Sequence, residues 1–339
     1  MKPIIKFHCT DVVVAMRLEQ RLDGPGEDAR PRRIEHRERV REDTRMHHSL
    51  DIPVGEITLR GRLYLPEDAT GPVPVVIAHE GIGSVAEIGF PYAHLFTDAG
   101  LGVAFYDHRG LGHSDGEPRQ QIDPWQFARD MRHVITHLSL RDDVDPARIA
   151  VWGFSLGGMV GMFAAATDTR PAAVVSVVPP VSGWSARKLF PPAELAALDA
   201  AIVADRLGQS RGEPPVVLQT SGHRTPDGPP VMFTDPEGLE FIKRFDGVRS
   251  WRNELTLSSL DHVFEMEVTA YAERITAPVL MVLADGDTVA PVEDAREMFK
   301  RITAPKELVE YPGQHYGILV DHFEEIVSRT TSWLAKTLV

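Results

Sequence analysis

The feature that most constrains the fold of this chain is residues 153–157, in which Ser155 has Gly153 two positions before it and Gly157 two positions after it. An apolar run precedes this segment and another, residues 159–166, follows it. The pattern predicts a strand, a sharp turn and a helix, with the serine at the tip of the turn. Glycines are required on both sides because strand and helix approach too closely there for side chains. A glycine-rich helix start would leave the position of the serine unexplained, so Ser155 is the candidate nucleophile.

The rest of the chain alternates between strand and helix patterns. Continuous apolar runs of the kind found in strands covered on both faces occur at residues 73–78, 101–106, 149–152, 172–178 and 278–283. Helical patterns separate several of these runs, at residues 86–99 and from 123 to 138. Only the opening, residues 52–63, shows the polar and apolar alternation of an antiparallel pair. We therefore expect an α/β fold with a mostly parallel central sheet flanked by helices.

A serine hydroxyl becomes a good nucleophile when a histidine removes its proton and a carboxylate orients that histidine. With a serine turn of this kind, the three members follow the chain order serine, acid, histidine. His315 lies in a glycine-flanked loop just past the last strand pattern, whereas His322 lies within the final helical pattern, so His315 is the candidate base. Asp287 is preferred as the acid over Asp285, which lies next to a glycine where it would cap the turn.

The alternation stops between about residues 183 and 274, where prolines, polar turns and helical patterns prevail. We interpret this stretch as a helical cap insertion, 183–274, in a core made of residues 47–182 and 275–339. The insertion leaves and rejoins the sheet at the edge that presents Ser155, so it is expected to cover the site and to influence substrate choice. Its large aromatic side chains are candidates for the pocket lining or for the core of the cap: Trp184, Phe190, Phe233 and Trp251.

Composition limits the partners. The formal net charge of −13 argues against nucleic-acid binding, which depends on Lys and Arg, and leaves small molecules as expected substrates. A single cysteine, Cys9, cannot form an intrachain disulfide, and charged residues interrupt the N-terminal apolar run, so a cytoplasmic location without membrane insertion is expected. Residues 1–46 carry charges of both signs, as in a solvated N-terminal arm, and contact between this arm and a second subunit would make the protein a homodimer.

Over residues 50–339 the chain resembles the α/β-hydrolase superfamily. The resemblance rests on the serine turn, the loop 107–114, Asp287 and the segment that ends in His315. Within the superfamily, residues 250–260 and 304–309 look like a capped group related to dienelactone hydrolases. That group is associated with esterase, thioesterase and polyketide release or transfer reactions.

The resemblance also bears on residues 79–83, which follow the strand pattern ending at residue 78. By position, the backbone N–H groups of Gly81 and of Leu156 are the expected oxyanion donors. Glu80 resembles a glutamate that approaches the nucleophile, a cysteine, in dienelactone hydrolases. Because the nucleophile position here is Ser155, Glu80 is either adjacent to the site or a salt-bridged loop residue, and its neighbour Ile82 is a further candidate for the site.

These observations predict a serine hydrolase that acts on a carboxylic ester or thioester through an acyl-enzyme. An acyltransferase or cyclase with the same three residues is the alternative, and a ligand-binding homologue without turnover is a second alternative. No cofactor is expected, and no metal, because the histidines lack ligand spacing.

Overall fold

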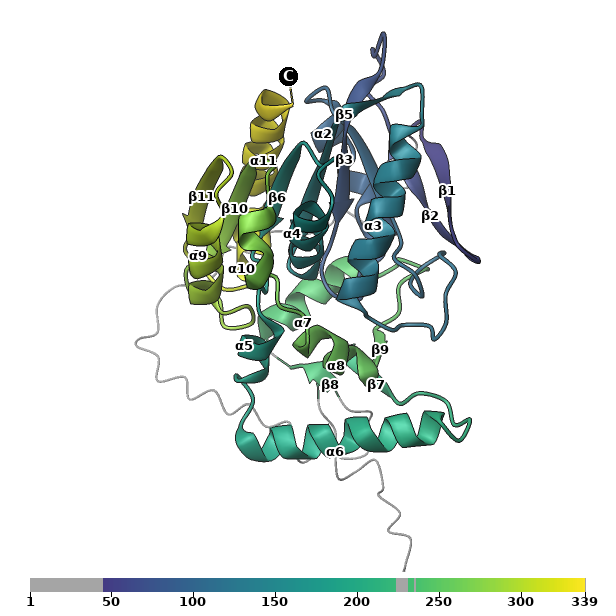
Figure 1. Cartoon of the computed structure of the whole chain (residues 1–339), viewed down its shortest axis with the longest axis vertical. Helices are drawn as coiled ribbons and strands as arrows, with labels where there is room; N and C mark the ends of the chain where they lie inside the picture. The colour runs from purple at the N-terminus through teal and green to yellow at the C-terminus, as the bar shows by residue number, and fades with distance from the viewer. Residues whose placement is uncertain (1–44, 224–230, 235, 339) are drawn as a thin grey trace, which may run out of the picture.

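The computed structural model describes residues 45–223, 231–234 and 236–338. All but the last two residues of the predicted N-terminal arm, 1–46, lie outside this description. The described chain is built on an eight-stranded sheet in the order β1-β2-β4-β3-β5-β6-β10-β11 (Figure 1). The strands are β1 (His48–Val54), β2 (Ile57–Tyr64), β3 (Val73–His79), β4 (Gly102–Tyr106), β5 (Val144–Phe154), β6 (Ala173–Val177), β10 (Val279–Ala284) and β11 (Lys306–Tyr311).

The sheet is parallel from β4 to β11, and only β1 and β2 run antiparallel to their neighbours. Every residue of β3, β4, β6 and β10 is buried, which explains their continuous apolar sequences. In β1, at the edge, buried residues alternate with exposed ones, as expected of a strand with one solvated face. The α/β fold predicted from the sequence is therefore confirmed.

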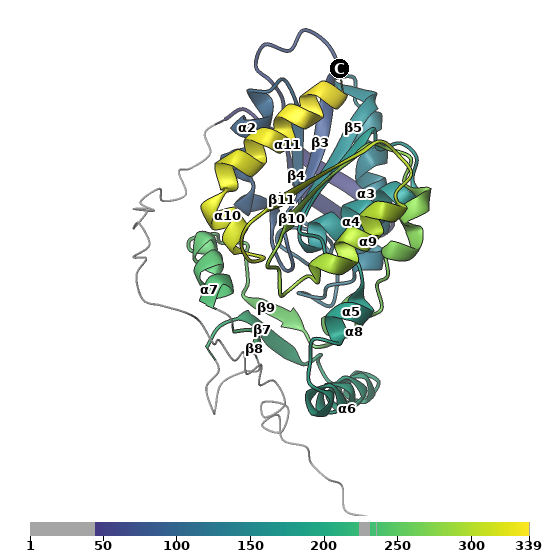
Figure 2. The ribbon, with the colours of Figure 1, turned by 90° about the vertical axis from the view of Figure 1, so that its left-hand side faces the viewer.

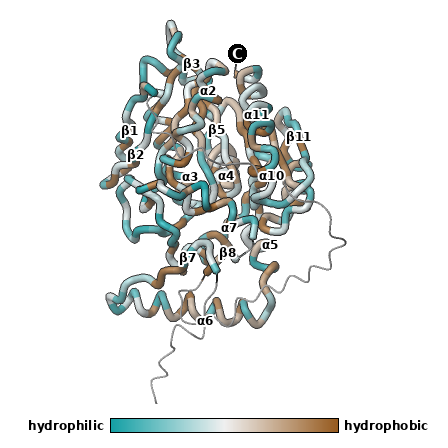
Figure 3. Tube along the Cα trace, turned by 180° about the vertical axis from the view of Figure 1, so that it is seen from behind, coloured by the Kyte–Doolittle hydropathy of each residue, from teal (hydrophilic) through white to brown (hydrophobic). Residues whose placement is uncertain are grey.

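Helices cover both faces of the sheet. On one side lie α2 (His94–Thr97) and α11 (Phe323–Thr337), and on the other lie α3 (Pro124–Ser139), α4 (Leu156–Thr167) and α9 (Val292–Arg301) (Figure 2). Seen from behind, the chain trace alternates between hydrophobic and hydrophilic colours along the outer helices, as expected of elements with one buried face (Figure 3).

The single helix expected over residues 86–99 is replaced by three short pieces, η1 (Ala86–Ile88), η2 (Phe90–Tyr92) and α2. Pro91 has no N–H to donate to a preceding turn. The neighbouring Gly89 packs so closely on the ring of Phe105 that an added Cβ would lie 2.4 Å from it. This segment is therefore shaped by its contact with β4 rather than by helix propensity.

Between β6 and β10 the chain forms the insertion, which lies beyond the carboxyl end of the sheet with α6 outermost (Figures 1 and 2). It contains α5 (Gly183–Arg187), α6 (Pro192–Gln209), β7 (Val217–Ser221), β8 (Val231–Phe233), α7 (Pro236–Ile242), η3 (Lys243–Phe245), β9 (Glu254–Thr256), α8 (Ser258–Phe264) and η4 (Thr269–Arg274). The strands form a second sheet, β8-β7-β9, which the sequence analysis did not predict because strands of three to five residues are too short to show a period.

The turn between β5 and α4 places Ser155 in a strained backbone conformation, with φ 52° and ψ −120°. Such strain costs about 1–3 kcal/mol and persists only where the surroundings fix it. Here the N–H of Ser155 donates to the carbonyl of Val177 over 2.8 Å, and its own carbonyl accepts from the N–H of Met159 over 3.1 Å. The strand on one side and the helix on the other thus hold the serine at the tip.

We predict that Gly157→Ala lowers the free energy of unfolding by about 3 kcal/mol or more. The added Cβ would lie 2.4 Å from the carbonyl oxygen of His79 and 2.6 Å from that of Glu80, and both of these atoms belong to the backbone. The matched control is Gly71→Ala, where no atom lies within 4 Å, so its effect should be small. Urea unfolding of both variants measures the difference, and equal midpoints would contradict the assignment of close contact at Gly157.

Candidate active site

Three side chains from three strand ends meet at the turn. His315, after β11, places its Nε2 atom 2.9 Å from the Oγ atom of Ser155, and its Nδ1 atom 2.7 Å from the Oδ2 atom of Asp287, after β10. All three are buried, with 9% of Ser155, 1% of His315 and 8% of Asp287 exposed. With the Nδ1–H donated to the carboxylate, Nε2 is left to accept the hydroxyl proton of the serine. The arrangement can therefore deprotonate Ser155.

The structure distinguishes the two candidate acids. The Oδ1 atom of Asp287 accepts hydrogen bonds from the N–H groups of Val289 and Ala290, over 2.9 and 2.8 Å, which leaves Oδ2 directed at the imidazole. Asp285 is exposed and instead accepts from the N–H of Gly313 over 3.1 Å. Asp285 thus ties the loop that carries His315, and Asp287 contacts the imidazole.

The other candidate histidine, His322, lies between α10 (Gly317–Asp321) and α11 and not inside one continuous helix. Its ring packs on that of Tyr311, with centroids 5.1 Å apart, and its Nδ1 atom lies 3.7 Å from Glu325. The structure does not bring it to Ser155.

The two predicted oxyanion donors lie beside the serine. Leu156 is the first residue of α4, where backbone N–H groups have no partner within the helix. Gly81 follows β3, and a Cβ added to it would lie 3.5 Å from the Cβ of Ser155. Within the described ranges, no protein acceptor is hydrogen-bonded to either N–H group. The two donors are thus free to bind an oxyanion formed next to Ser155.

Glu80 sits between β3 and Gly81 and is half-buried. Burial raises the pKa of its carboxyl group, and the positive charge of Arg244 acts in the opposite direction. Arg244 belongs to η3 of the insertion, where it donates to the hydroxyl of Tyr92 over 2.8 Å and lies over the ring of Phe323. No ion pair joins Glu80 to a residue of the described chain, so the structure does not support the alternative of a salt-bridged loop residue.

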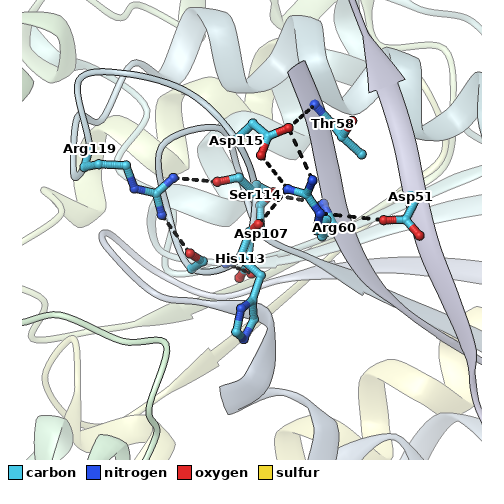
Figure 4. Close-up of polar contacts among 9 residues, drawn as sticks. Asp51, Thr58, Arg60, Asp107, His113, Ser114, Asp115 and Arg119 are labelled. Atoms are coloured by element: carbon cyan, nitrogen blue, oxygen red, sulfur yellow. Dashed lines mark hydrogen bonds and ion pairs between the residues drawn. The ribbon is translucent and has the colours of Figure 1, made fainter. Parts of the chain in front are cut away.

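A loop after β4 braces the segment that carries Gly81. The carboxylate of Asp107 accepts from the N–H of Ala86 over 2.7 Å. It also accepts from the N–H of His113 in its own loop, over 2.7 Å (Figure 4). The guanidinium of Arg119 closes the loop by donating to the carbonyls of Gly112 and Ser114. Asp107 belongs to the loop that supported the family resemblance, but its contact with Ala86 was not foreseen.

The same loop is fixed to β2 on one side (Figure 4). Arg60 donates to the carboxylate of Asp115 over 2.6 Å, and its backbone N–H donates to the hydroxyl of Ser114 over 2.8 Å. At its other end, Gln120 reaches the insertion, because its carbonyl accepts from the N–H of Thr256 over 2.9 Å. This loop is thus one contact between the core and the insertion, beside the hydrogen bond from Arg244 to Tyr92 and that from Ser250 to Glu87.

Two buried histidines lie under the end of β3. The Nδ1–H of His79 donates to the carbonyl of Glu80 over 2.7 Å, and its ring packs on His108 with centroids 3.9 Å apart. Burial lowers the pKa of His79 to about 4, although the hydrogen bond to Glu80 acts to raise it. His108 is stacked flat on Phe127, and burial lowers its pKa well below the usual range. Both imidazoles are therefore neutral near pH 7.

Aromatic side chains of the core and insertion surround the imidazole. Phe154 and Tyr316 pack on His315, with ring centroids 5.5 and 4.9 Å away. Phe241, from α7, contacts both of these rings, and Phe245 extends the cluster outward. Phe241 was missed because nothing in the local sequence distinguishes it from other apolar residues of the insertion.

The predicted aromatic candidates have different surroundings. Trp251 packs on Phe245, at the outer end of this cluster. Phe190 contacts Phe264 within the insertion, and Trp184 is 57% exposed with Lys188 over its ring, which does not support a role in an enclosed pocket. Ile82 is half-buried against the core.

The described part of the chain contains no helix with the length and apolar character needed to cross a bilayer. Over the same ranges, no group of three or more His, Cys, Asp or Glu side chains is placed to hold a metal ion.

Comparison with known proteins places these features in context. A family model described as serine aminopeptidase, S33, matches residues 71–322. The thiohydrolase aneE of Aspergillus aculeatus is 28% identical over 309 residues, which cover 85% of this chain and 92% of that protein. The polyketide transferase ATR5 of Stachybotrys chlorohalonatus is 30% identical over 293 residues, which cover 83% of this chain and 94% of that protein. Among solved structures, that of DcsB in complex with its substrate analogue superposes with a TM-score of 0.75 and 28% sequence identity. The match covers 86% of this chain and 99% of DcsB.

The lowered pKa of His79 predicts a loss of stability in acid. Between the unfolded pKa of about 6.5 and the folded value of about 4, the unfolded chain binds more protons at His79 than the folded chain does. The contribution of His79 to the free energy of unfolding is therefore complete above pH 6.5 and falls as the pH drops toward 4. The lowered pKa of His79 corresponds to about 3 kcal/mol in the free energy of unfolding. Urea unfolding at pH 7.5 and at pH 4.5 should therefore show a smaller loss for His79→Asn, which keeps a side-chain donor, than for the wild type. Equal losses would contradict the burial of a neutral imidazole at this position.

Proposed function

Because this chain belongs to the α/β-hydrolase family described as serine aminopeptidase S33, we propose that it cleaves or transfers a carboxylic ester or thioester through an acyl-enzyme formed on Ser155. His315 is the general base and acid, and Asp287 orients it. The observation that carries the proposal is the pair of hydrogen bonds made by His315, 2.9 Å to the serine hydroxyl and 2.7 Å to the carboxylate.

The reaction follows from the positions of these groups. His315 Nε2 takes the hydroxyl proton as the Oγ atom of Ser155 bonds to the substrate carbonyl carbon, and Asp287 stabilises the imidazolium that forms. The N–H groups of Gly81 and Leu156 donate to the oxyanion of the tetrahedral intermediate. As the intermediate collapses, the bond to the leaving thiolate or alkoxide breaks, and the leaving group takes the proton from His315. A second nucleophile then releases the acyl group by the same steps in reverse.

The second nucleophile distinguishes the two candidate reactions. Water gives hydrolysis, and an alcohol or amine gives acyl transfer or cyclisation. The relatives named thiohydrolase and polyketide transferase support a thioester as the acyl donor. The relative named polyketide transferase supports transfer as the second candidate.

We further propose that residues 183–274 act as a cap that holds the acyl chain. The aromatic cluster that begins at Phe154 and Tyr316 continues into this insertion through Phe241 and Phe245, which supports an apolar acyl group. The expected substrate is a small molecule. The exclusion of nucleic acid, the cytoplasmic location and a homodimer, all expected from the sequence, stay predictions.

The proposal is tested with Ser155→Ala. We expect this variant to fold normally, to lose labelling by a fluorophosphonate and to lose turnover of acyl thioesters by about a millionfold, because the nucleophile is removed. Product analysis for the wild type, with and without added alcohols, then separates hydrolysis from transfer. Labelling or turnover near the wild-type level in the alanine variant would exclude Ser155 as the nucleophile.

The two aspartates provide a matched pair of variants. Asp287→Asn should lower kcat by about 10⁴-fold, because the amide no longer fixes the tautomer or charge of His315. Asp285→Asn should cost far less, since its carboxylate contacts only the loop N–H of Gly313. Steady-state kinetics on one p-nitrophenyl ester compares them, with thermal melts as the folding control. A larger loss for Asp285→Asn would transfer the orienting role to that residue.

A further inference from the structure

The outer face of α6 is unusually apolar for an exposed helix. Its inner face buries Leu198 and Ile202, and Asp205 fixes the helix to the insertion by accepting the N–H of Val216 over 2.8 Å. The exposed residues between positions 193 and 207 are Ala193, Ala196, Asp199, Ala200, Val203, Ala204, Arg206 and Leu207. Val203 and Leu207 are 52% and 55% exposed. Only two members of this outer face carry a charge.

Other long helices of the described chain expose polar side chains instead. On α9 the exposed residues are Glu293, Glu297, Lys300 and Arg301, and on α3 they are Arg129, His133 and Thr136. On α11 they are all charged residues or serines. Because water does not favour so many apolar side chains on one exposed stripe, the outer face of α6 is a candidate interface.

The order of side chains along this face selects a partner. Three alanines occupy its first half, Ala193, Ala196 and Ala200, and the larger Val203 and Leu207 lie in its second half together with Ala204. When two copies of such a helix pack antiparallel, the small residues of one lie against the large residues of the other, and the alanines permit close approach of the backbones. Parallel packing would place large side chains against each other.

The two charges fit the same arrangement. Asp199 and Arg206 lie the same number of residues on either side of the peptide bond between Ile202 and Val203. A two-fold axis at that bond therefore sets each aspartate opposite the arginine of the other copy, twice per dimer. Both side chains have room for a second partner, because they are 50% and 59% exposed while paired with Arg187 and Asp261.

We propose that the outer face of α6 is the interface of a homodimer, in which two copies of this helix pack antiparallel about a two-fold axis near Val203. A stable dimer buries about 800 Å² on each partner, more than one helix stripe provides. A dimer of that size therefore also requires contacts beyond α6, and the exposed Trp184, Leu189 and Val217, which lie near α6 in the sequence, are candidates for them. Since α6 is the outermost element of the insertion, the dimer would hold the proposed cap of each copy against that of the other (Figures 1 and 2).

The first test compares two exposed leucines by sedimentation equilibrium. The wild-type chain should have twice the mass of one copy. Leu207→Glu should raise the dimer dissociation constant by about a hundredfold or more, because each dimer would bury two unpaired carboxylates. The matched control is Leu140→Glu, at the end of α3, where the leucine is 81% exposed and far from α6 in the fold. This control should remain dimeric.

The second test uses charge reversal and does not depend on the stability of one variant. Asp199→Arg alone and Arg206→Asp alone should each weaken the homodimer, because like charges then face each other across the axis. An equimolar mixture of the two variants should restore dimers, since every facing pair is opposite in sign again. Native mass spectrometry distinguishes the mixed dimer from either homodimer, and circular dichroism checks folding.

Several results would overturn the proposal. These are a monomeric wild type, a dimer that Leu207→Glu leaves intact, and a failure of the mixed variants to form dimers. If the wild type is monomeric and floats with phosphatidylcholine vesicles while Leu207→Glu does not, the apolar face of α6 binds lipid and the proposed homodimer is excluded.

Discussion

The close approach of β3, β5 and the start of α4 is the constraint on which the rest of the site depends. At Gly157 the helix backbone lies so near the carbonyls of His79 and Glu80 that no side chain fits between them. This contact brings the start of α4, with Leu156, beside the segment that carries Gly81, although the two residues are far apart in the sequence. The strained serine backbone is the energetic cost of that geometry, and the surrounding parallel strands supply the rigidity that maintains it.

The parallel sheet explains why the remaining groups converge. In a parallel sheet, the carboxyl ends of all strands lie at one edge, so the loops after β5, β10 and β11 are neighbours. His315 is then fixed from both sides, by Asp287 and by the rings of Phe154 and Tyr316. A base that is held in one rotamer before the substrate arrives loses little entropy during the reaction. The site is therefore preorganised by the fold and not by a single bond.

The sequence predicted the parts of the molecule whose pattern is local. The strand, turn and helix around Ser155 could be recognised because each element shows its own period and the glycines have a steric reason. The sequence favoured Asp287 over Asp285 only through the glycine beside Asp285, since both aspartates follow the same strand. The fold of the next turn, in which two N–H groups donate to Asp287, gives the physical reason for that preference.

Other features depend on contacts between distant segments and left no local signal. The second sheet of the insertion is too short to produce a period, and the segment after residue 86 follows the shape of β4 at Phe105. The exposure of Trp184 likewise depends on which face of the insertion turns outward. In each case tertiary packing overrides a reasonable local expectation.

The loop after β4 contacts both the segment that carries Gly81 and the insertion. Near its start, Asp107 holds Ala86 and thereby the segment that carries the Gly81 donor, and at its end Gln120 holds β9 of the insertion. Arg119 ties the middle of the loop to itself. Because these contacts belong to one braced segment, the position of the insertion over the site and the position of the oxyanion donor are not independent. The proposed cap is thus connected, through one loop, to the segment that carries the proposed oxyanion donor Gly81.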